Sequence, residues 1–216
     1  NSSINTPNIS ITAGVPTQNF SYLLMEKNAA SNILTLNCPV GITGQITFTT
    51  GVISTSATNL LVVESSATST VGSVSSFVNG PVRKKGGGSF TFPTGVIVGS
   101  EYHHRTIGIT ASGNDGSSYT ARFFRSSAGA LGPISVVAKA NGLQRISRCE
   151  YWSLVKDAGS DVGVTLTWTD QSPCNAAYVT APATIVAVQF NGTQWGDLFG
   201  GTGVGTATAG SVTWTG

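Results

Sequence analysis

The sequence predicts an all-β protein, in which a β-sandwich follows short strands that form either solenoid-like rungs or a meander. Runs rich in Val, Ile, Thr and Phe recur at short intervals between Gly, Asn, Ser and Pro, which is typical of strands and turns. Between residues 162 and 169 apolar side chains alternate with Gly and Thr, the pattern of a strand with one buried face. No segment has a convincing helical period, since the best candidate, residues 22–30, suits a strand equally well.

The chain divides into three parts, with its main change of character near Gly80. Residues 1–32 are expected to be an N-terminal extended segment. Residues 33–80 indicate successive short strands between small turns, which stack as irregular rungs or fold as a meander. In residues 81–216 the aromatic side chains concentrate, and they can fill the space between the two sheets of a sandwich. The apolar run 185–190 offers side chains to both faces, so it predicts a central strand of that sandwich.

Charged residues make up only 9% of the chain, whereas hydrophobic residues make up 40%. An ordinary soluble domain carries about 25% charged residues, so this surface is expected to consist mainly of Ser, Thr, Gly and Asn. Such a neutral surface suits contact with copies of the protein or with sugar, because few charges lose water on contact. The net charge of +2 offers little counterion release, so nucleic acid is not an expected partner. No apolar run approaches the roughly 18 residues of a membrane span, so no membrane insertion is expected.

The densest basic run is Arg83–Lys85, which precedes three glycines. It could contact acidic polysaccharide or lipid headgroups, but a solvated turn is the simpler interpretation. The sequence begins at Asn1 without the charged and apolar regions of a signal peptide, which indicates a mature product or a fragment.

Four motifs carry the most specific information: Phe77 with Gly80-Pro81-Val82, the run Phe90–Gly95, the run Cys149–Trp152, and Trp168 followed by Cys174. In this order they resemble a β-rich repeat of very large secreted surface proteins of gliding bacteria (Bacteroidota), which are exported by the type IX secretion route. The match covers roughly residues 33–216. The resemblance implies an extracellular location at the cell surface and an adhesive or fibrous role, and it implies no known reaction.

The cysteines of the last two motifs are expected to form a disulfide. Cys149 and Cys174 lie on neighbouring elements of the repeat, and a bond between them would be worth about 3 kcal/mol in the chain-entropy model. Cys38 is then left over, as a buried thiol or, less simply, as part of an intermolecular bridge. The three cysteines have no C-x-x-C spacing, so we expect no metal site from them.

The histidines do not favour an enzyme. His103 and His104 are adjacent, so on a strand they point to opposite faces and cannot share a metal in the usual way. One of them could join Glu101 or Asp115 and a serine in a triad. No G-x-S-x-G elbow supports that arrangement, and a solvated strand end is the simpler interpretation. Nor does the sequence pair any two of the nine carboxylates as a glycosidase requires.

No cofactor is expected, and calcium is the one alternative. The run Asn114–Gly116, or Asp157 together with Asp161, could ligate calcium through oxygen atoms. Neither matches the spacing of an EF-hand loop. A polar turn explains Asn114–Gly116 more simply.

The N-terminal region offers spare extended segments, and we expect one of them to pair with a neighbouring copy. Strand addition of this kind would link copies into a fibre. The alternative is that the segment completes a sheet of its own chain. The residues expected in such an intersubunit strand are Ile9, Ile11, Phe20, Tyr22 and Leu24.

Two classes of function follow from the sequence. The first is an extracellular structural or adhesive surface protein that assembles with copies of itself or with adjacent repeats. The second is a carbohydrate-binding module of a larger secreted protein, in which exposed indole rings stack on surface polysaccharide. Trp195 and Trp214 lie in polar, Gly-rich surroundings and are the candidates for that contact, although each could instead cover the core at its rim. Trp168 belongs to the apolar face of its strand and is expected in the core.

Overall fold

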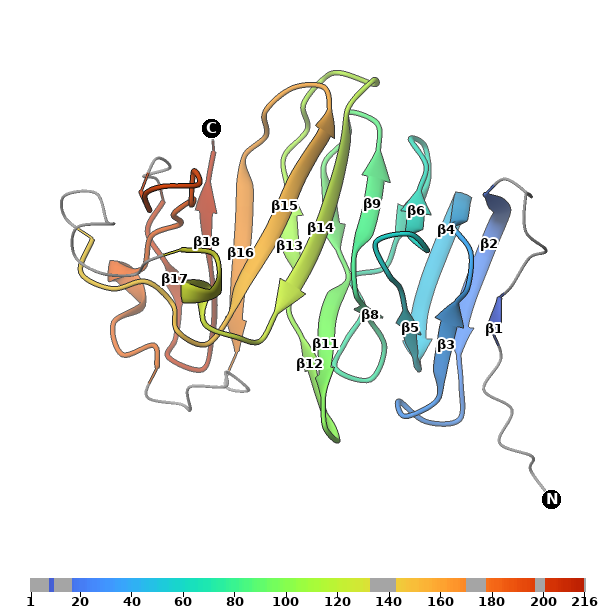
Figure 1. Cartoon of the computed structure of the whole chain (residues 1–216), viewed down its shortest axis with the longest axis horizontal. Coiled ribbons are helices and arrows are strands. Elements are labelled where there is room, and N and C mark those ends of the chain that lie inside the picture. Colours follow the sequence, from blue (N-terminus) through green and yellow to red (C-terminus); the bar gives the residue numbers. More distant parts are fainter. Residues whose placement is uncertain (1–7, 10–16, 133–142, 170–177, 197–200, 216) are drawn as a thin grey trace.

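The computed structural model describes most of the 216 residues, namely 8–9, 17–132, 143–169, 178–196 and 201–215. Regular structure in these ranges consists of strands and two short 3-10 turns, η1 (Ala128–Ala130) and η3 (Pro182–Thr184). The predicted all-β fold is therefore confirmed. The strands follow one another along the longest axis of the molecule, from the N-terminal strands at one end to the C-terminal strands at the other (Figure 1).

Three sheets make up the molecule. Sheet 1 has the order β15 (Tyr151–Ala158), β14 (Ser118–Phe124), β9 (Val82–Lys85), β6 (Leu61–Val63), β4 (Val40–Thr50) and β2 (Gln18–Glu26). Sheet 2 has the order β1 (Asn8–Ile9), β3 (Ile33–Leu36), β5 (Val52–Ser54), β8 (Val78–Asn79), β11 (Thr94–Val98) and β12 (Glu101–His104). Sheet 3 has the order β10 (Phe90–Phe92), β13 (Ile107–Ile109), β16 (Val164–Thr169), β18 (Ala209–Trp214) and β17 (Val204–Gly205). The short strand β7 (Thr68–Ser69) pairs with β4.

The N-terminal half is a solenoid of parallel rungs. Along sheet 1 the successive backbone partners are Gln18, Val40, Leu61 and Val82. Equivalent positions are therefore 22, 21 and 21 residues apart in sequence. In sheet 2, β3, β5, β8 and β11 are parallel as well. Each rung returns the chain to the same sheet one strand further on, so of the two arrangements expected for this region the structure has the solenoid-like stacking and not the meander.

Both sheets continue across the expected boundary near Gly80. There β9 adds to β6, and β11 adds to β8, in parallel. Gly80 has a φ of +131°, and a Cβ at this position would lie 2.4 Å from the Oγ1 atom of Thr55. Only glycine fits this turn between rungs. The Thr55 hydroxyl donates a 2.8 Å hydrogen bond to the Pro81 carbonyl, which ties the two rungs together.

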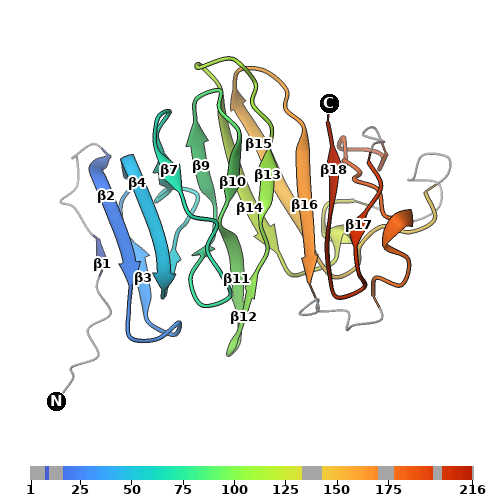
Figure 2. The same ribbon diagram turned by 180° about the vertical axis from the view of Figure 1, so that it is seen from behind.

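After β11 the pairing becomes antiparallel. The strand β12 turns back on β11, β14 and β15 extend sheet 1, and β13, β16 and β18 extend sheet 3. Figures 1 and 2 view these layers from opposite sides. Inward side chains of both sheets share one core, to which β14 contributes Tyr119 and Ala121 and β13 contributes Ile107 and Ile109. This half has the two-layer architecture of the predicted sandwich.

Two local predictions are corrected or resolved by the structure. The central strand expected at residues 185–190 is wrong, because this segment has only isolated bridges after the turn η3. Its apolar side chains pack in two separate clusters instead: Ile185 packs beside Trp168, and Phe190 packs beside Trp195.

Residues 22–26, the start of the candidate helix, belong to strand β2. Neither of the short helical turns in the described ranges is long or apolar enough to span a bilayer.

Candidate functional site

The outward face of sheet 1 carries charged, hydroxyl and aromatic side chains close together. Strand alternation turns Arg83 and Lys85 outward on β9, while Lys84 between them is only 3% exposed. Arg83 lies 3.2 Å from the carboxylate of Asp157 on β15, and its Nε donates a 3.0 Å bond to Thr120 on β14. The hydroxyl of Thr120 in turn donates a 2.6 Å bond to Asp157. Three neighbouring strands therefore meet in one polar cluster.

An aromatic pair lies next to this cluster. The rings of Phe124 on β14 and Tyr151 on β15 are stacked, with centroids 4.7 Å apart and an interplanar angle of 9°. The guanidinium of Arg122 lies 4.6 Å from the centroid of Phe124, a distance at which the ring face attracts the cation. Arg122 is exposed, and no acidic side chain pairs with it in the described part of the chain.

Two shallow depressions follow this face. The first, of about 290 Å³, lies over β15, β14 and β9, and the second, of about 430 Å³, extends over β6 toward β2. Both are lined by Ala57, Leu60 and Arg83, so they are neighbours that join at the loop before β6. We call the combined depression the trough. It crosses the strands of sheet 1, which lie side by side in Figure 1.

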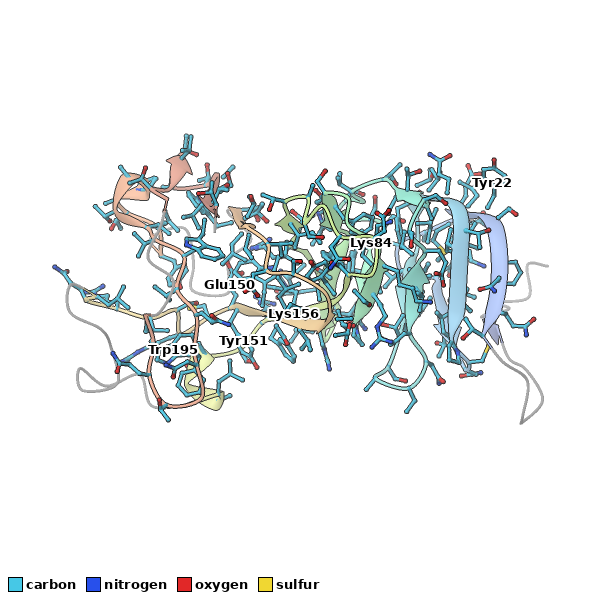
Figure 3. The ribbon with its side chains drawn as sticks, turned by 90° about the horizontal axis from the view of Figure 1, so that it is seen from above. Tyr22, Lys84, Glu150, Tyr151, Lys156 and Trp195 are labelled. Carbon is cyan, nitrogen blue, oxygen red and sulfur yellow. The ribbon has the colours of Figure 1, made fainter. Side chains whose placement is uncertain are left out.

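The basic run Arg83–Lys85 is a strand, which corrects its simpler interpretation as a solvated turn. Lys84 points inward, and its ammonium donates hydrogen bonds of 2.7, 2.9 and 3.0 Å to the carbonyls of Glu64, Ser65 and Ala67. The ammonium also lies 5.4 Å from the centroid of Phe90. Burial lowers the pKa of Lys84, although the carboxylate of Glu64 opposes that shift. In Figure 3 the labelled Lys84 lies within the body of the molecule.

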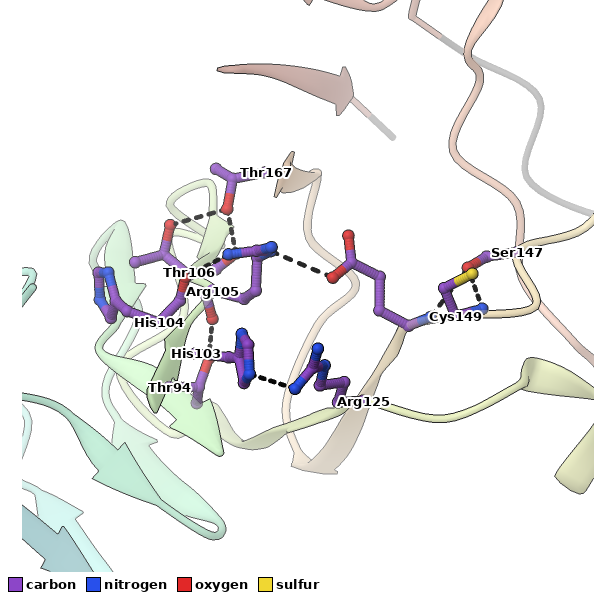
Figure 4. A network of polar contacts seen from close by, with 10 residues as sticks. Thr94, His103, His104, Arg105, Thr106, Arg125, Ser147, Cys149 and Thr167 are labelled. Carbon is purple, nitrogen blue, oxygen red and sulfur yellow. Dashed lines mark hydrogen bonds and ion pairs between the residues drawn. The ribbon is translucent and has the colours of Figure 1, made fainter. Parts of the chain in front are cut away.

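The two histidines point to different surroundings, as their adjacency predicts. His103 is 5% exposed, and its Nε2 lies 3.3 Å from the carboxylate of Glu101. The same Nε2 contacts the guanidinium of Arg125 (Figure 4). The Nε2 of His104 lies 2.8 Å from the carbonyl of Val71. Burial is the main cause that lowers the pKa of each histidine, and the Arg125 charge lowers that of His103 further.

A buried ion pair lies beside His103. The Nε of Arg105 is 3.1 Å from the carboxylate of Glu150, and both side chains are almost completely buried. Arg105 also donates a 2.9 Å bond to the carbonyl of His104. Burial raises the pKa of Glu150, although the charge of Arg105 beside it favours the carboxylate. Within the described residues, the His103 imidazole has hydrogen bonds to the side chains of Glu101 and Arg125, so the cluster brings an acid and two guanidiniums together around it.

The carboxylates suggested for calcium do not converge. Asp157 pairs with Arg83, and Asp161 pairs with Lys156 at 2.7 Å. Asn114–Gly116 forms a turn in which the Asn114 side chain accepts a 3.0 Å bond from the Gly116 amide, as predicted for a polar turn. Across the described ranges, no group of three or more His, Cys, Asp and Glu side chains is placed to hold a metal ion.

The cysteines are partly within the described residues. Cys38 is a thiol buried in the solenoid core, 3% exposed, which agrees with the first of its two interpretations. Cys149 is 6% exposed and takes part in a disulfide. Its predicted partner, Cys174, lies outside the described residues, so the pairing of Cys149 with Cys174 stays a prediction.

Of the two tryptophans suggested for sugar contact, Trp195 covers the core instead, and Trp214 is half-buried. Trp195 is 5% exposed and packs against Phe190, with ring centroids 5.0 Å apart. It lies in the C-terminal third of the molecule in Figure 3, and its buried indole is not presented to a ligand. Trp214 is half-buried and packs beside Val212. Trp168 is 6% exposed, as expected of a core residue, and donates a 2.9 Å bond to the carbonyl of Thr206.

The residues expected in an intersubunit strand lie in sheets of their own chain, wherever the structure describes them. Ile9 belongs to β1, which pairs with β3, and Ile11 lies outside the described residues. Phe20, Tyr22 and Leu24 belong to β2, which pairs with β4. These strands therefore complete the chain's own sheets, which was the alternative to strand donation. Their side chains are nevertheless exposed, by 38% at Phe20, 76% at Tyr22 and 57% at Leu24.

The group of Arg122, Phe124 and Tyr151 was missed from the sequence. Alternation along residues 118–124 is a usable signal, because it turns Arg122 and Phe124 to the face opposite Tyr119 and Phe123. The pairing of Phe124 with Tyr151 is not readable from the sequence, because the two strands are joined by 26 intervening residues and their register is set by tertiary structure.

No protein-family model, curated protein or solved structure matches this chain. The resemblance to the surface-protein repeat of gliding bacteria therefore rests on the sequence motifs alone, and the extracellular location that it implies stays a prediction.

Proposed function

We propose that this chain is an extracellular structural and adhesive surface protein, which associates with copies of itself or with adjacent repeats by strand addition at β2. The proposal includes no catalytic step and no cofactor. One observation carries it: the edge strand β2 is long, almost uncharged, and exposes large apolar side chains.

The two edge strands of sheet 1, β15 and β2, differ in the number of charged side chains that they carry. β15 carries Lys156 and Asp157, which form ion pairs with Asp161 and Arg83. Charges of this kind discourage another strand from pairing. β2 is nine residues long, and Glu26 at its end is its single charged residue. An exposed edge of this length with a single charge at its end favours strand addition.

The geometry of β2 also suits an incoming strand. The register between β2 and β4 shifts twice, between Phe20 and Tyr22 and between Met25 and Glu26. In both places the extra residue lies on β4 and not on β2. Figure 3 places Tyr22 at one end of the long axis, where another molecule can approach.

The composition supports the same proposal. With 9% charged residues, the protein loses little charge hydration when it packs against another copy. A closed dimer results if two β2 edges meet across a two-fold axis, whereas a fibre results if β2 receives a different segment of its neighbour.

Sedimentation velocity over a concentration series, with negative-stain images of the largest species, tests this proposal. The double variant Tyr22→Lys/Leu24→Lys adds charge to the β2 edge at two exposed positions, so it should keep the fold and lose association. Val204→Lys is the matched control, because Val204 is 71% exposed on another edge strand, β17. Removing residues 1–16 then distinguishes a donated N-terminal segment, which would be lost, from pairing of two β2 edges.

A wild-type chain that stays monomeric at every concentration would contradict the proposal. So would a double variant that associates as the wild type does. Association lost in the Val204 variant alone would move the interface to sheet 3.

A further inference from the structure

The trough on sheet 1 has the form and chemistry of a site for an extended polymer. Its lining residues belong to strands β15, β14, β9, β6 and β2, and with about 4.8 Å between neighbouring strands of sheet 1 it extends about 24 Å from β15 to β2. Its floor includes the apolar side chains Leu60, Val62 and Val155, while Asn19, Thr58 and Thr120 supply amide and hydroxyl groups. A shallow surface with this mixture suits a molecule that has both apolar faces and hydroxyl groups along its length.

The charges of the trough favour a negatively charged ligand. Arg83 pairs with Asp157 and Lys85 with Glu64, at 3.2 and 3.0 Å. Arg122 is the third cation, and it has no acidic partner among the described side chains. The trough therefore holds three cations against two carboxylates, with the excess positive charge beside Phe124.

We propose that the trough binds a linear acidic polysaccharide, and that Arg122 contacts a carboxylate of a sugar unit. The planar guanidinium matches a carboxylate with two parallel hydrogen bonds. Phe124 lines the trough beside Arg122. Because Tyr151 stacks on its ring, Phe124 offers its apolar edge, against which the C–H groups of a sugar ring can pack. Arg83 lies at the centre of the trough, where it can exchange part of its contact with Asp157 for a second carboxylate.

The small number of unpaired cations in the trough favours an acidic polysaccharide over nucleic acid. One unpaired cation supplies little of the counterion release that drives nucleic-acid binding. Hydroxyl and amide groups along the rest of the trough match the hydroxyls of sugar. The inference does not depend on association at β2, because Tyr22 and Leu24 do not line the trough.

Isothermal titration of the full chain with polygalacturonate tests the proposal, with the fully methyl-esterified polymer as the uncharged control. We expect binding of the acid polymer that is at least tenfold tighter than binding of the ester. Arg122→Gln removes the unpaired cation and should weaken binding by about tenfold. Val155→Asp adds a carboxylate to the floor at a position 50% exposed, and should weaken it at least as much.

Lys156→Gln is the matched control for general charge attraction. It removes one exposed positive charge from the same sheet, outside the residues that line the trough, and binding should change less than twofold. Unchanged thermal unfolding midpoints would show that each variant is folded.

Four results would overturn the proposal. These are no binding of the acid polymer, equal binding of the ester, equal loss in the Lys156 and Arg122 variants, and equally tight binding of single-stranded DNA. The last result would identify the trough as a general polyanion surface.

Discussion

The two halves of the molecule are stabilised by different kinds of contact. In the parallel half, rungs of 21 or 22 residues stack aliphatic side chains on their equivalents, and each rung contacts mainly its neighbours. In the antiparallel half, contacts join distant parts of the sequence through polar groups, such as the pair of Arg105 with Glu150 and the 2.7 Å bond from Tyr119 to the Ser160 carbonyl. The edge of sheet 1 in the parallel half is β2, which has a single charged residue. The edge of the same sheet in the antiparallel half is β15, which carries Lys156 and Asp157.

This difference predicts how far the structural effect of a substitution extends in each half. A change in a rung should affect neighbouring rungs, because its contacts are local along the axis. A change in the antiparallel half should affect the fold more widely, because Glu150 and Arg105 lie 45 residues apart in sequence and join two sheets to the segment before β15.

The largest effect is expected from Glu150→Leu. The substitution leaves the buried guanidinium of Arg105 without its carboxylate, which costs about 3–5 kcal/mol of unfolding free energy. The double variant Arg105→Met/Glu150→Leu should recover most of this loss, because it removes both buried charges. Urea denaturation of the two variants measures the difference. A double variant no more stable than the single one would show that the charged pair is not the main cause.

In the parallel half, Lys84→Met should cost about 2–3 kcal/mol, because three carbonyls between Glu64 and Ala67 lose a buried donor. Lys85→Met is the matched control. Its side chain faces outward, where the ion pair with Glu64 is partly exposed, so its cost should stay below about 1 kcal/mol. Equal costs for the two variants in urea denaturation would contradict the inward orientation of Lys84.

A smaller effect is expected from the histidines at the junction of the halves. The pKa of His103 and that of His104 are lowered in the folded protein from 6.5, so the unfolded chain binds more protons below that pH. The contribution of the two histidines to the free energy of unfolding should therefore fall as the pH drops through 6.5 toward the lowered pKa values. Around His103 the charged groups are Glu101, Arg125 and Arg105. The lowered pKa of Glu101 adds a loss only below 4.5.

His103→Gln should make this pH dependence shallower, and His103→Gln/His104→Gln should make it shallower still. Urea denaturation between about pH 7 and about pH 5 measures it. A slope unchanged in the double variant would contradict the burial of the imidazoles.

The sequence predicts the all-β fold class and the short strands of residues 33–80, because both depend on local alternation and turn residues. It leaves stacked rungs and a meander as alternatives, and the parallel pairing of the strands decides between them. The same alternation could have placed Lys84 inward, but the basic run Arg83–Lys85 suggested a turn before the glycines. The prediction of a central strand at residues 185–190 is wrong because its pattern is ambiguous. A buried strand has apolar side chains on both faces, and so does an irregular segment that packs between two hydrophobic clusters.

The candidate surface could be predicted only in part. Exposure of β2 depends on which strand ends sheet 1, and the meeting of Arg83, Thr120 and Asp157 depends on the pairing of three strands far apart in sequence. Trp195 shows the reverse case, since its polar neighbours in sequence suggested exposure while tertiary contacts with Phe190 bury it.

Hydrogen exchange at peptide resolution, at low and high protein concentration, tests the contrast between the two edges of sheet 1 most directly. We expect amides of β2, residues 18–26, to become protected as the concentration rises, while protection of β15, residues 151–158, stays the same. Protection that rises at β15, or that does not change at β2 while the protein associates, would contradict it.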